Sequence, residues 1–305
     1  MLARFLLAAL LLSPPAVFAQ HSLAAPERSA LLARVHGEMS FLASDALRGR
    51  GSGTHDELVA ATYVASQFQS FGLEGAEVQR VPLASGGETY NALAVLRGTD
   101  EAAQALLLSS HLDHLGVRGD RLYPGADDDA SGTIAVMELA RWLAHRHPRR
   151  TIVFVCFGSE ESGGQGNQYF LQHPPVALAS IVANVEFEMI GRRDPALRGD
   201  GLWLTGWERS DLGPTLDKHG APLVADPHPE QQFFLRSDNI ALARRGIVAQ
   251  TVSSFGLGSH YHQPSDDAAH IDYQHLAAAI EGMLSSLEWL ADTNWTPSWR
   301  VGGRP

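Results

Sequence analysis

The alternation of short apolar runs with helical stretches is the strongest constraint on the fold of this chain. Five runs lack period-two alternation, at residues 92–96 (ALAVL), 105–110 (ALLLSS), 151–157 (TIVFVCF), 180–189 (SIVANVEFEM) and 247–252 (IVAQTV). Runs of this kind are typical of strands that are covered on both faces. Because helical stretches separate them, we expect an α/β fold, a three-layer sandwich whose mostly parallel mixed sheet has helices on both faces.

Three segments show helical spacing of apolar residues. They are residues 56–71, 131–144 and 271–292. In the first, Leu58, Ala61, Ala65 and Phe68 recur at near-helical intervals and the pattern stops at Gly72. The stretch HSLAAPERS, residues 21–29, is expected to be a short flexible start.

The first nineteen residues resemble a secretory signal peptide. Arg4 precedes an apolar run, and small residues occupy the positions before a plausible cleavage site after Ala19. The run is interrupted by Ser13-Pro14-Pro15, well short of the roughly 20 apolar residues that a membrane span needs. We therefore expect a single domain over residues 20–305, exported to a periplasm or the medium, with no membrane span in the mature form. The formal net charge of −11 argues against nucleic acid as a partner.

Polar residues follow four of the predicted strands directly or after a short turn. The segments are HLDH (111–114), GSEES (158–162), EMIG (188–191) and YHQPSDD (261–267). The carboxyl ends of parallel strands meet at one edge of a sheet, so these residues should gather there.

Three consecutive aspartates, Asp127, Asp128 and Asp129, precede the helical segment that starts near residue 131. A helix cap explains one carboxylate at this position. Three adjacent carboxylates repel one another unless a cation holds them. The sequence therefore predicts a metal site at this turn.

Imidazole and carboxylate donors without a thiolate suit zinc in a catalytic site, although cobalt or manganese could use the same set. Two metal ions that share a bridging carboxylate and have two terminal ligands each need five side chains. We expect two divalent ions, zinc first, held by His111, Asp128, Glu161, Glu188 and His262.

From about residue 38 to 276, these motifs resemble the co-catalytic two-zinc aminopeptidases of clan MH, the bacterial leucyl-aminopeptidase-like exopeptidases. The resemblance includes FLASDALRGRGSG near the start, then HLDH, PGADDDASG, SEESGGQGNQYF, EMIG and YHQPSDD in the order of the family. It implies the zinc-exopeptidase type of sandwich, and it makes residues 20–305 a metallopeptidase catalytic domain.

The resemblance also implies roles for the metal ligands. Asp128 would bridge the two ions, Glu188 would accompany His111, and His262 would accompany Glu161. The family often has a cis peptide after its bridging aspartate, so we expect one between Asp128 and Asp129.

Other roles carried over from the family concern the reaction. Glu160 would be the general base, and Tyr261 matches a tyrosine that stabilises the oxyanion in some members. Asp113 would fix the tautomer of the His111 imidazole through its carboxylate. Asp238 is expected near the ligands or in the substrate pocket.

Two positions depart from the family pattern. Glu188 stands where an aspartate is usual, and Glu186, two residues earlier on the same strand face, could ligate instead. Asn239 stands where many members have histidine, which leaves its role open. Residues 203–207 (WLTGW) and 231–235 (QQFFL) could line an apolar substrate pocket or belong to the core.

The implied function is hydrolysis of the N-terminal peptide bond of peptides with a free N-terminus. Glutaminyl cyclases are relatives with a similar acidic pair, usually with one zinc and a different sequence around the bridging aspartate. A binding protein that keeps the fold without chemistry is a further alternative. It usually lacks ligands or the base, and all of these positions are filled here.

Overall fold

The computed structural model of the protein describes residues 22–305, so the predicted signal peptide, residues 1–19, lies outside the described residues. Within the described part, no helix combines the length and the apolar content that crossing a bilayer requires.

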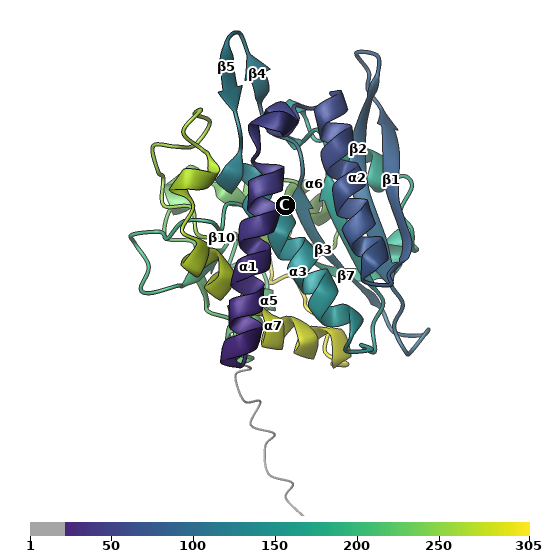
Figure 1. The fold of residues 1–305 in the computed structure, drawn as a ribbon. Helices are drawn as coiled ribbons and strands as arrows, with labels where there is room; N and C mark the ends of the chain where they lie inside the picture. The colour runs from purple at the N-terminus through teal and green to yellow at the C-terminus, as the bar shows by residue number, and fades with distance from the viewer. Residues whose placement is uncertain (1–21) are drawn as a thin grey trace, which may run out of the picture.

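An eight-stranded sheet forms the centre of the molecule (Figure 1). Its spatial order is β1 (Glu74–Pro82), β2 (Glu88–Leu96), β6 (Ile152–Phe157), β3 (Ala105–His111), β7 (Ile181–Phe187), β10 (Val248–Ser253), β8 (Leu202–Leu204) and β9 (Leu223–Ala225). The central strands β6, β3, β7 and β10 run parallel to one another, whereas β1–β2, β2–β6 and β10–β8 are antiparallel pairs. The predicted mixed, mostly parallel sheet is therefore confirmed.

Helices cover both faces of this sheet. They are α1 (Ala25–Leu42), α2 (His55–Ser70), α3 (Gly132–Ala144), α4 (Gln165–Phe170), α5 (Leu212–Lys218), α6 (Asn239–Arg244) and α7 (Tyr273–Asp292). Figure 1 shows α1, α2 and α3 in front of the sheet and α6 behind it. On β6, Ile152, Phe154 and Cys156 pack into the core with α1, α2, α3 and α7, and the residues between them pack into a second core with α6. This two-sided burial explains why β6 is apolar at every position.

The five predicted strands and three predicted helices are all present, with ends within a few residues of the expected ones. The exception is β2, which begins at Glu88, before the apolar run. All residues of β3 and β6 are buried, as expected for strands in the middle of a covered sheet.

The expectation of a flexible start at residues 21–29 is wrong, because α1 begins at Ala25. Its first turn is stabilised locally, since the Glu27 carboxylate accepts a hydrogen bond of 3.1 Å from the Ala24 N–H. Arg28 then binds Glu281 of α7 with a 2.7 Å hydrogen bond from Nε. A tertiary partner more than 250 residues away is not visible in a local pattern.

Two further elements have weak sequence signals. The edge strand β1 is largely exposed and lacks an apolar run. The short hairpin of β4 (Gly116–Arg118) and β5 (Arg121–Tyr123) follows His114 in the sequence and precedes the aspartate turn. It extends away from the sheet (Figure 1).

Arg50 fastens the base of this hairpin to the N-terminal part of the chain. Its fully buried guanidinium donates hydrogen bonds to four main-chain carbonyls, those of Leu42, Leu112, Pro124 and Gly125. Buried carbonyls need partners, so one side chain satisfies the loops on both sides of the hairpin.

Candidate metal centre

Four strands deliver polar side chains to the same edge of the sheet. β3 ends at His111, and β7 is followed directly by Glu188. β6 is followed by the short turn η3 (Glu160–Ser162), and the loop after β10 brings in His262. Because β6, β3, β7 and β10 are parallel, their carboxyl ends place these residues together, as the sequence predicts.

His111, Asp128 and Glu188 form one group of possible metal donors, with one atom of each within 4.8 Å of the others. His111 Nε2 lies 3.1 Å from Asp128 Oδ1. Both residues are buried, and His111 Nε2 has no hydrogen-bond partner.

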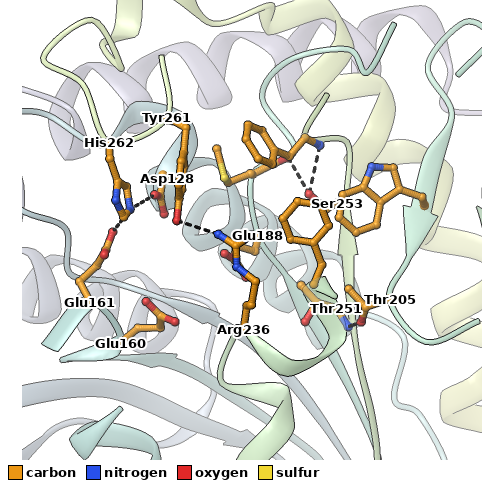
Figure 2. Close-up of a pocket in the computed structure, with 14 residues that line it drawn as sticks. Asp128, Glu160, Glu161, Glu188, Thr205, Arg236, Thr251, Ser253, Tyr261 and His262 are labelled. Atoms are coloured by element: carbon orange, nitrogen blue, oxygen red, sulfur yellow. Dashed lines mark hydrogen bonds and ion pairs between the residues drawn. The ribbon is translucent and has the colours of Figure 1, made fainter. Parts of the chain in front are cut away.

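The other oxygen of Asp128 faces a second group. His262 Nε2 lies 3.2 Å from Asp128 Oδ2 and 3.0 Å from Glu161 Oε1 (Figure 2). His114, Asp128 and Glu161 likewise offer donor atoms within 4.8 Å of one another. Asp128 therefore belongs to two candidate metal sites.

The buried polar atoms of these groups fit divalent cations. Asp128 Oδ2 and both ring nitrogens of His114 are buried without a hydrogen-bond partner, although such atoms are normally satisfied. Burial alone would raise the pKa of Asp128, but the neighbouring His114, His111 and His262 hold it well below its ordinary value. An ionised carboxylate and the imidazoles around it together form a donor set that suits zinc.

Glu160 lies at the edge of this centre and lines the same pocket as Asp128 and Glu188 (Figure 2). Burial raises the pKa of its carboxyl well above the ordinary value, and Glu188 and Asp238 add to this while His111 opposes it. Bound dications would favour the ionised form, which a base requires.

Asp113 acts differently from the expected pattern. The ring nitrogen Nδ1 of His111 lies 3.1 Å from the main-chain oxygen of Asp113, so the carbonyl, and not the carboxylate, orients the imidazole. The Asp113 carboxylate accepts hydrogen bonds from the Ser52 hydroxyl and, at 2.9 Å, from the main-chain N–H of Glu160. Through the second of these bonds, Asp113 holds the main chain of Glu160, the residue expected to be the base.

Asp127 and Asp129 flank the shared ligand and fix the surrounding main chain. Asp129 accepts hydrogen bonds from the N–H groups of Gly132 (2.9 Å), Met189 (3.1 Å) and His111 (3.3 Å). Asp127 accepts one from the N–H of Gly191 at 2.7 Å. The peptide bond between Asp128 and Asp129 is cis, as predicted.

The partners of Glu188 and Glu186 favour Glu188 as the candidate ligand. The buried Glu186 carboxylate accepts hydrogen bonds from the N–H of Asn239 (2.6 Å) and from the hydroxyls of Ser237 and Thr251 (3.2 Å each). Its oxygens are thus occupied, whereas Glu188 joins His111 and Asp128.

Asn239 and Asp238 lie behind the centre. Asn239 has a structural role, since its amide also donates to the main-chain oxygens of Phe234 and Ala249. Asp238 Oδ1 accepts a 3.2 Å hydrogen bond from Asn167, while its Oδ2 is buried without a partner. Burial raises the pKa of Asp238 to about 7, against the effect of His111.

An aromatic pocket adjoins the donor groups (Figure 2). It is lined by Met189, Trp203, Phe233, Phe255 and Tyr261, with Thr205, Thr251 and Ser253 on its polar side. Tyr261 stacks on His262 at 3.9 Å between ring centroids, and Arg236 Nη2 donates to its hydroxyl at 3.4 Å.

The two segments proposed as pocket or core contribute to both. Trp203, Thr205 and Phe233 line the pocket. Trp207 and Phe234 pack into the two cores instead.

His114 is the donor that the sequence analysis did not include. It is the second histidine of HLDH, three residues after His111. Gly125 makes room for it, since a Cβ at Gly125 would lie 2.5 Å from His114 Cγ and the glycine has a φ of 64°. In the sequence, the second histidine of HLDH was the signal that could have identified His114 as a candidate donor.

Comparison with known proteins finds metalloproteases among those similar to this chain. A probable zinc metalloprotease of Pyrenophora tritici-repentis is 36% identical over 104 residues, which are 32% of this chain and 24% of that protein. A vacuolar membrane protease of Candida albicans is 33% identical over 112 residues, 37% of this chain and 13% of that protein. The chain thus spans a quarter or less of these two relatives.

Solved structures share the fold over most of their length. The LapA aminopeptidase of Legionella pneumophila superposes with a TM-score of 0.68 at 21% identity, over 93% of this chain and 79% of that one. BSAP, a zinc aminopeptidase from Bacillus subtilis, gives 0.69 at 15% identity, over 86% and 95%. The glutaminyl cyclase of Porphyromonas gingivalis gives 0.65 at 20% identity, over 86% and 98%.

The model of Peptidase family M28 matches residues 91–287, more than half of the chain and the region that carries every donor described above. The chain therefore belongs to Peptidase family M28.

Proposed function

We propose that this protein is an exported, metal-dependent aminopeptidase that hydrolyses the N-terminal peptide bond of peptides. The observation that carries the proposal is the pair of donor groups sharing Asp128, with the carboxylate of Glu160 and an aromatic pocket beside them. The zinc aminopeptidases of similar fold support it, as does the family of the chain.

Two zinc ions would be held by His111, Asp128 and Glu188 on one side and by Asp128, Glu161 and His262 on the other. When bound, such ions supply Lewis acidity and lower the pKa of water toward neutrality. They also offset the repulsion among the buried carboxylates.

Glu160 would take the proton of the attacking water and pass it to the leaving amine. The main-chain N–H of Glu160 donates a hydrogen bond of 2.9 Å to the Asp113 carboxylate. This bond fixes the turn from which the Glu160 carboxylate extends. No covalent intermediate is needed.

Tyr261 would stabilise the oxyanion through its hydroxyl. The ring is held by stacking on His262, and Arg236 donates a hydrogen bond to the hydroxyl oxygen, which leaves the O–H free to donate. Burial raises the pKa of Tyr261, so the hydroxyl keeps its proton at neutral pH.

The free amine of the substrate would lie beside the carboxylates of the centre, and the first side chain would enter the aromatic pocket. An apolar pocket beside a few polar groups is the usual form of a small-molecule site. Peptides with a free N-terminus are therefore the proposed substrates.

Export rests on residues 1–19, whose pattern is that of a signal peptide. Expression of the full chain in a Gram-negative host, followed by fractionation and N-terminal sequencing, tests it. Recovery in the cytoplasm with Met1 intact would argue against export.

Glutaminyl cyclisation is the second candidate, because a glutaminyl cyclase has a similar fold. The two reactions differ in product, since a peptidase releases a free amino acid and a cyclase forms pyroglutamate from an N-terminal glutamine. Glutaminyl cyclases usually have one zinc. This chain keeps the donors for a second ion, Asp128, Glu161 and His262, and therefore fits the peptidase better.

The deciding experiment combines metal analysis with two assays on the purified protein. Aminoacyl-p-nitroanilides and a Gln-peptide are incubated with the metal-loaded protein, with the chelated protein, and after zinc or cobalt is added back. We expect amino acid release that chelation abolishes and metal restores. Pyroglutamate alone would favour the cyclase, and absence of both products in a metal-loaded sample would favour a binding protein.

A further inference from the structure

The donor group around Glu161 contains His114, Asp128 and Glu161, and a second imidazole, that of His262, lies beside the same two carboxylates. His114 Nδ1 lies 2.9 Å from Glu161 Oε1 and 3.7 Å from Asp128 Oδ2. His262 Nε2 lies 3.0 Å from the same Glu161 oxygen and 3.2 Å from the same Asp128 oxygen. Two imidazoles thus face the same two carboxylate oxygens, Glu161 Oε1 and Asp128 Oδ2.

These spacings fit one tetrahedral ion. Zinc bonds to nitrogen and oxygen of roughly 2.0–2.1 Å put neighbouring donors of a regular tetrahedron about 3.3 Å apart. The four distances between imidazole nitrogens and carboxylate oxygens, 2.9, 3.0, 3.2 and 3.7 Å, are distributed around that value.

His114 is buried at this position. Its Nε2 has no hydrogen-bond partner, and its Nδ1 faces the carboxylate oxygens of Glu161 and Asp128. Its main-chain N–H donates to the Arg50 oxygen at 3.3 Å, which anchors the residue to a buried segment. A core histidine without a ligand would normally use its ring nitrogens in hydrogen bonds.

The other donor group is different. His111, Asp128 and Glu188 supply three protein donors. Glu160 lines the same pocket as Glu188, a member of this group. A three-donor zinc site keeps an open position for water or substrate, whereas a site with four protein donors is closed.

We propose that the two metal sites of this chain are unequal: His114, Asp128, Glu161 and His262 form a closed, tighter site, and His111, Asp128 and Glu188 form an open, weaker one. This inference rests on the proposed two-metal function and deepens it. The first ion bound is held by two imidazoles, and the open position for the reacting water lies on the side of His111.

The test is a metal titration of the chelated protein with Co²⁺ and Zn²⁺. Tetrahedral Co²⁺ absorbs visible light far more strongly than octahedral Co²⁺, because an octahedron has a centre of symmetry and a tetrahedron does not, so the spectrum reports geometry. We expect the first equivalent to give a strong tetrahedral spectrum, and the two equivalents to bind with two separable affinities in a competing chelator.

His114→Ala and His114→Gln should change the spectrum of the first equivalent and weaken its binding at least about tenfold, since even residues outside the ligand shell change metal affinity that much. His111→Ala should instead weaken the second equivalent and leave the first spectrum. The exposed His55→Ala is the matched control and should behave as the wild type. Thermal melting of each variant shows whether it is folded.

X-ray absorption of wild-type protein with one equivalent of Zn²⁺ does not depend on any variant. Scattering from two imidazoles supports the proposal, and scattering from one overturns it. If His114→Gln binds two metals, keeps peptidase activity and binds the first metal as tightly as the wild type, the inference is overturned. The proposed function would then still stand. Failure of the wild type to bind metal would overturn it together with the proposed function.

Discussion

Asp266 accepts a hydrogen bond of 3.1 Å from the main-chain N–H of Asp128, the residue shared by the two candidate metal sites. Its other oxygen accepts from the N–H of Asp127 at 3.0 Å and from Arg192 Nη2 at 2.8 Å. The last motif of the sequence, YHQPSDD, thus supplies both the candidate ligand His262 and the carboxylate that fixes the aspartate turn.

Asp266→Asn should weaken both the turn and metal binding. An asparagine amide cannot accept from one of the two N–H groups, which leaves a buried donor unpaired at a cost of about 1–3 kcal/mol. Urea unfolding of the metal-free protein and chelator competition measure the two effects. The neighbouring Asp267→Asn is the control, because asparagine caps a turn as well as aspartate does. Equal behaviour of the two variants would contradict the role of Asp266.

Glu160→Gln should keep both metals and lower kcat about 10²- to 10⁴-fold, the range that a general acid–base group contributes. The carboxylate is absent from both donor groups, so its loss leaves the ligands in place. Metal content and steady-state kinetics with an aminoacyl-p-nitroanilide are measured together. Glu208→Gln, whose side chain is 75% exposed, serves as control. A variant with nearly wild-type kcat would exclude Glu160 as the base.

Phe233→Ala should alter the choice of N-terminal residue. Phe233 stacks on Trp203 with ring centroids 5.3 Å apart and meets Phe255 edge-on at 5.8 Å, so its removal opens the pocket. We expect kcat/KM for leucyl and phenylalanyl substrates to fall roughly 10- to 100-fold, and for alanyl substrates less. Leu235→Ala, on the same loop and 45% exposed, is the control. A uniform fall for all substrates would show that Phe233 does not select the side chain.

Glu38 should make stability depend on pH far from the metal centre. Burial raises its pKa to about 9, the nearby Glu138 adds to this, and Arg141 opposes it, whereas the ordinary value is 4.5. The folded chain therefore keeps a proton that the unfolded chain releases. The stabilisation is complete below about pH 4.5 and is lost as the pH rises through about 9.

Glu38→Gln should remove this slope, which is at most about 1.4 kcal/mol per pH unit. Urea unfolding of metal-free wild type and variant at pH 5, 7 and 9 gives the comparison, with the exposed Glu77→Gln as control. A stability difference between wild type and Glu38→Gln that does not change with pH would contradict the assignment.

The sequence predicts the strands and the ligand-bearing edge well because burial on both faces leaves a clear pattern, as in β6. It does not predict α1, since Arg28 depends on Glu281 in α7. Nor does it predict β8 and β9, strands of three residues that belong to the sheet only through their neighbours.

At the site, the residue types predict most of the candidate donors that the structure brings together, but not His114 or the residues that support the donors. His111 and His262 follow from spacing and motif. Asp113 shows the limit, because whether its carbonyl or its carboxylate reaches His111 depends on the direction of the chain after β3. His114 shows another, because its burial depends on the hairpin β4–β5 returning Gly125 beside it.

The guanidinium of Arg50 and the hydroxyl of Ser52 lie upstream of the family match, which begins at residue 91, yet they hold Leu112, Gly125 and Asp113 next to the ligands. A recombinant fragment trimmed to the matched stretch would leave these carbonyls and this carboxylate without their donors. The smallest unit able to assemble the centre therefore reaches back at least to Arg50, and with α1 packed on α7 it extends to the first described helix.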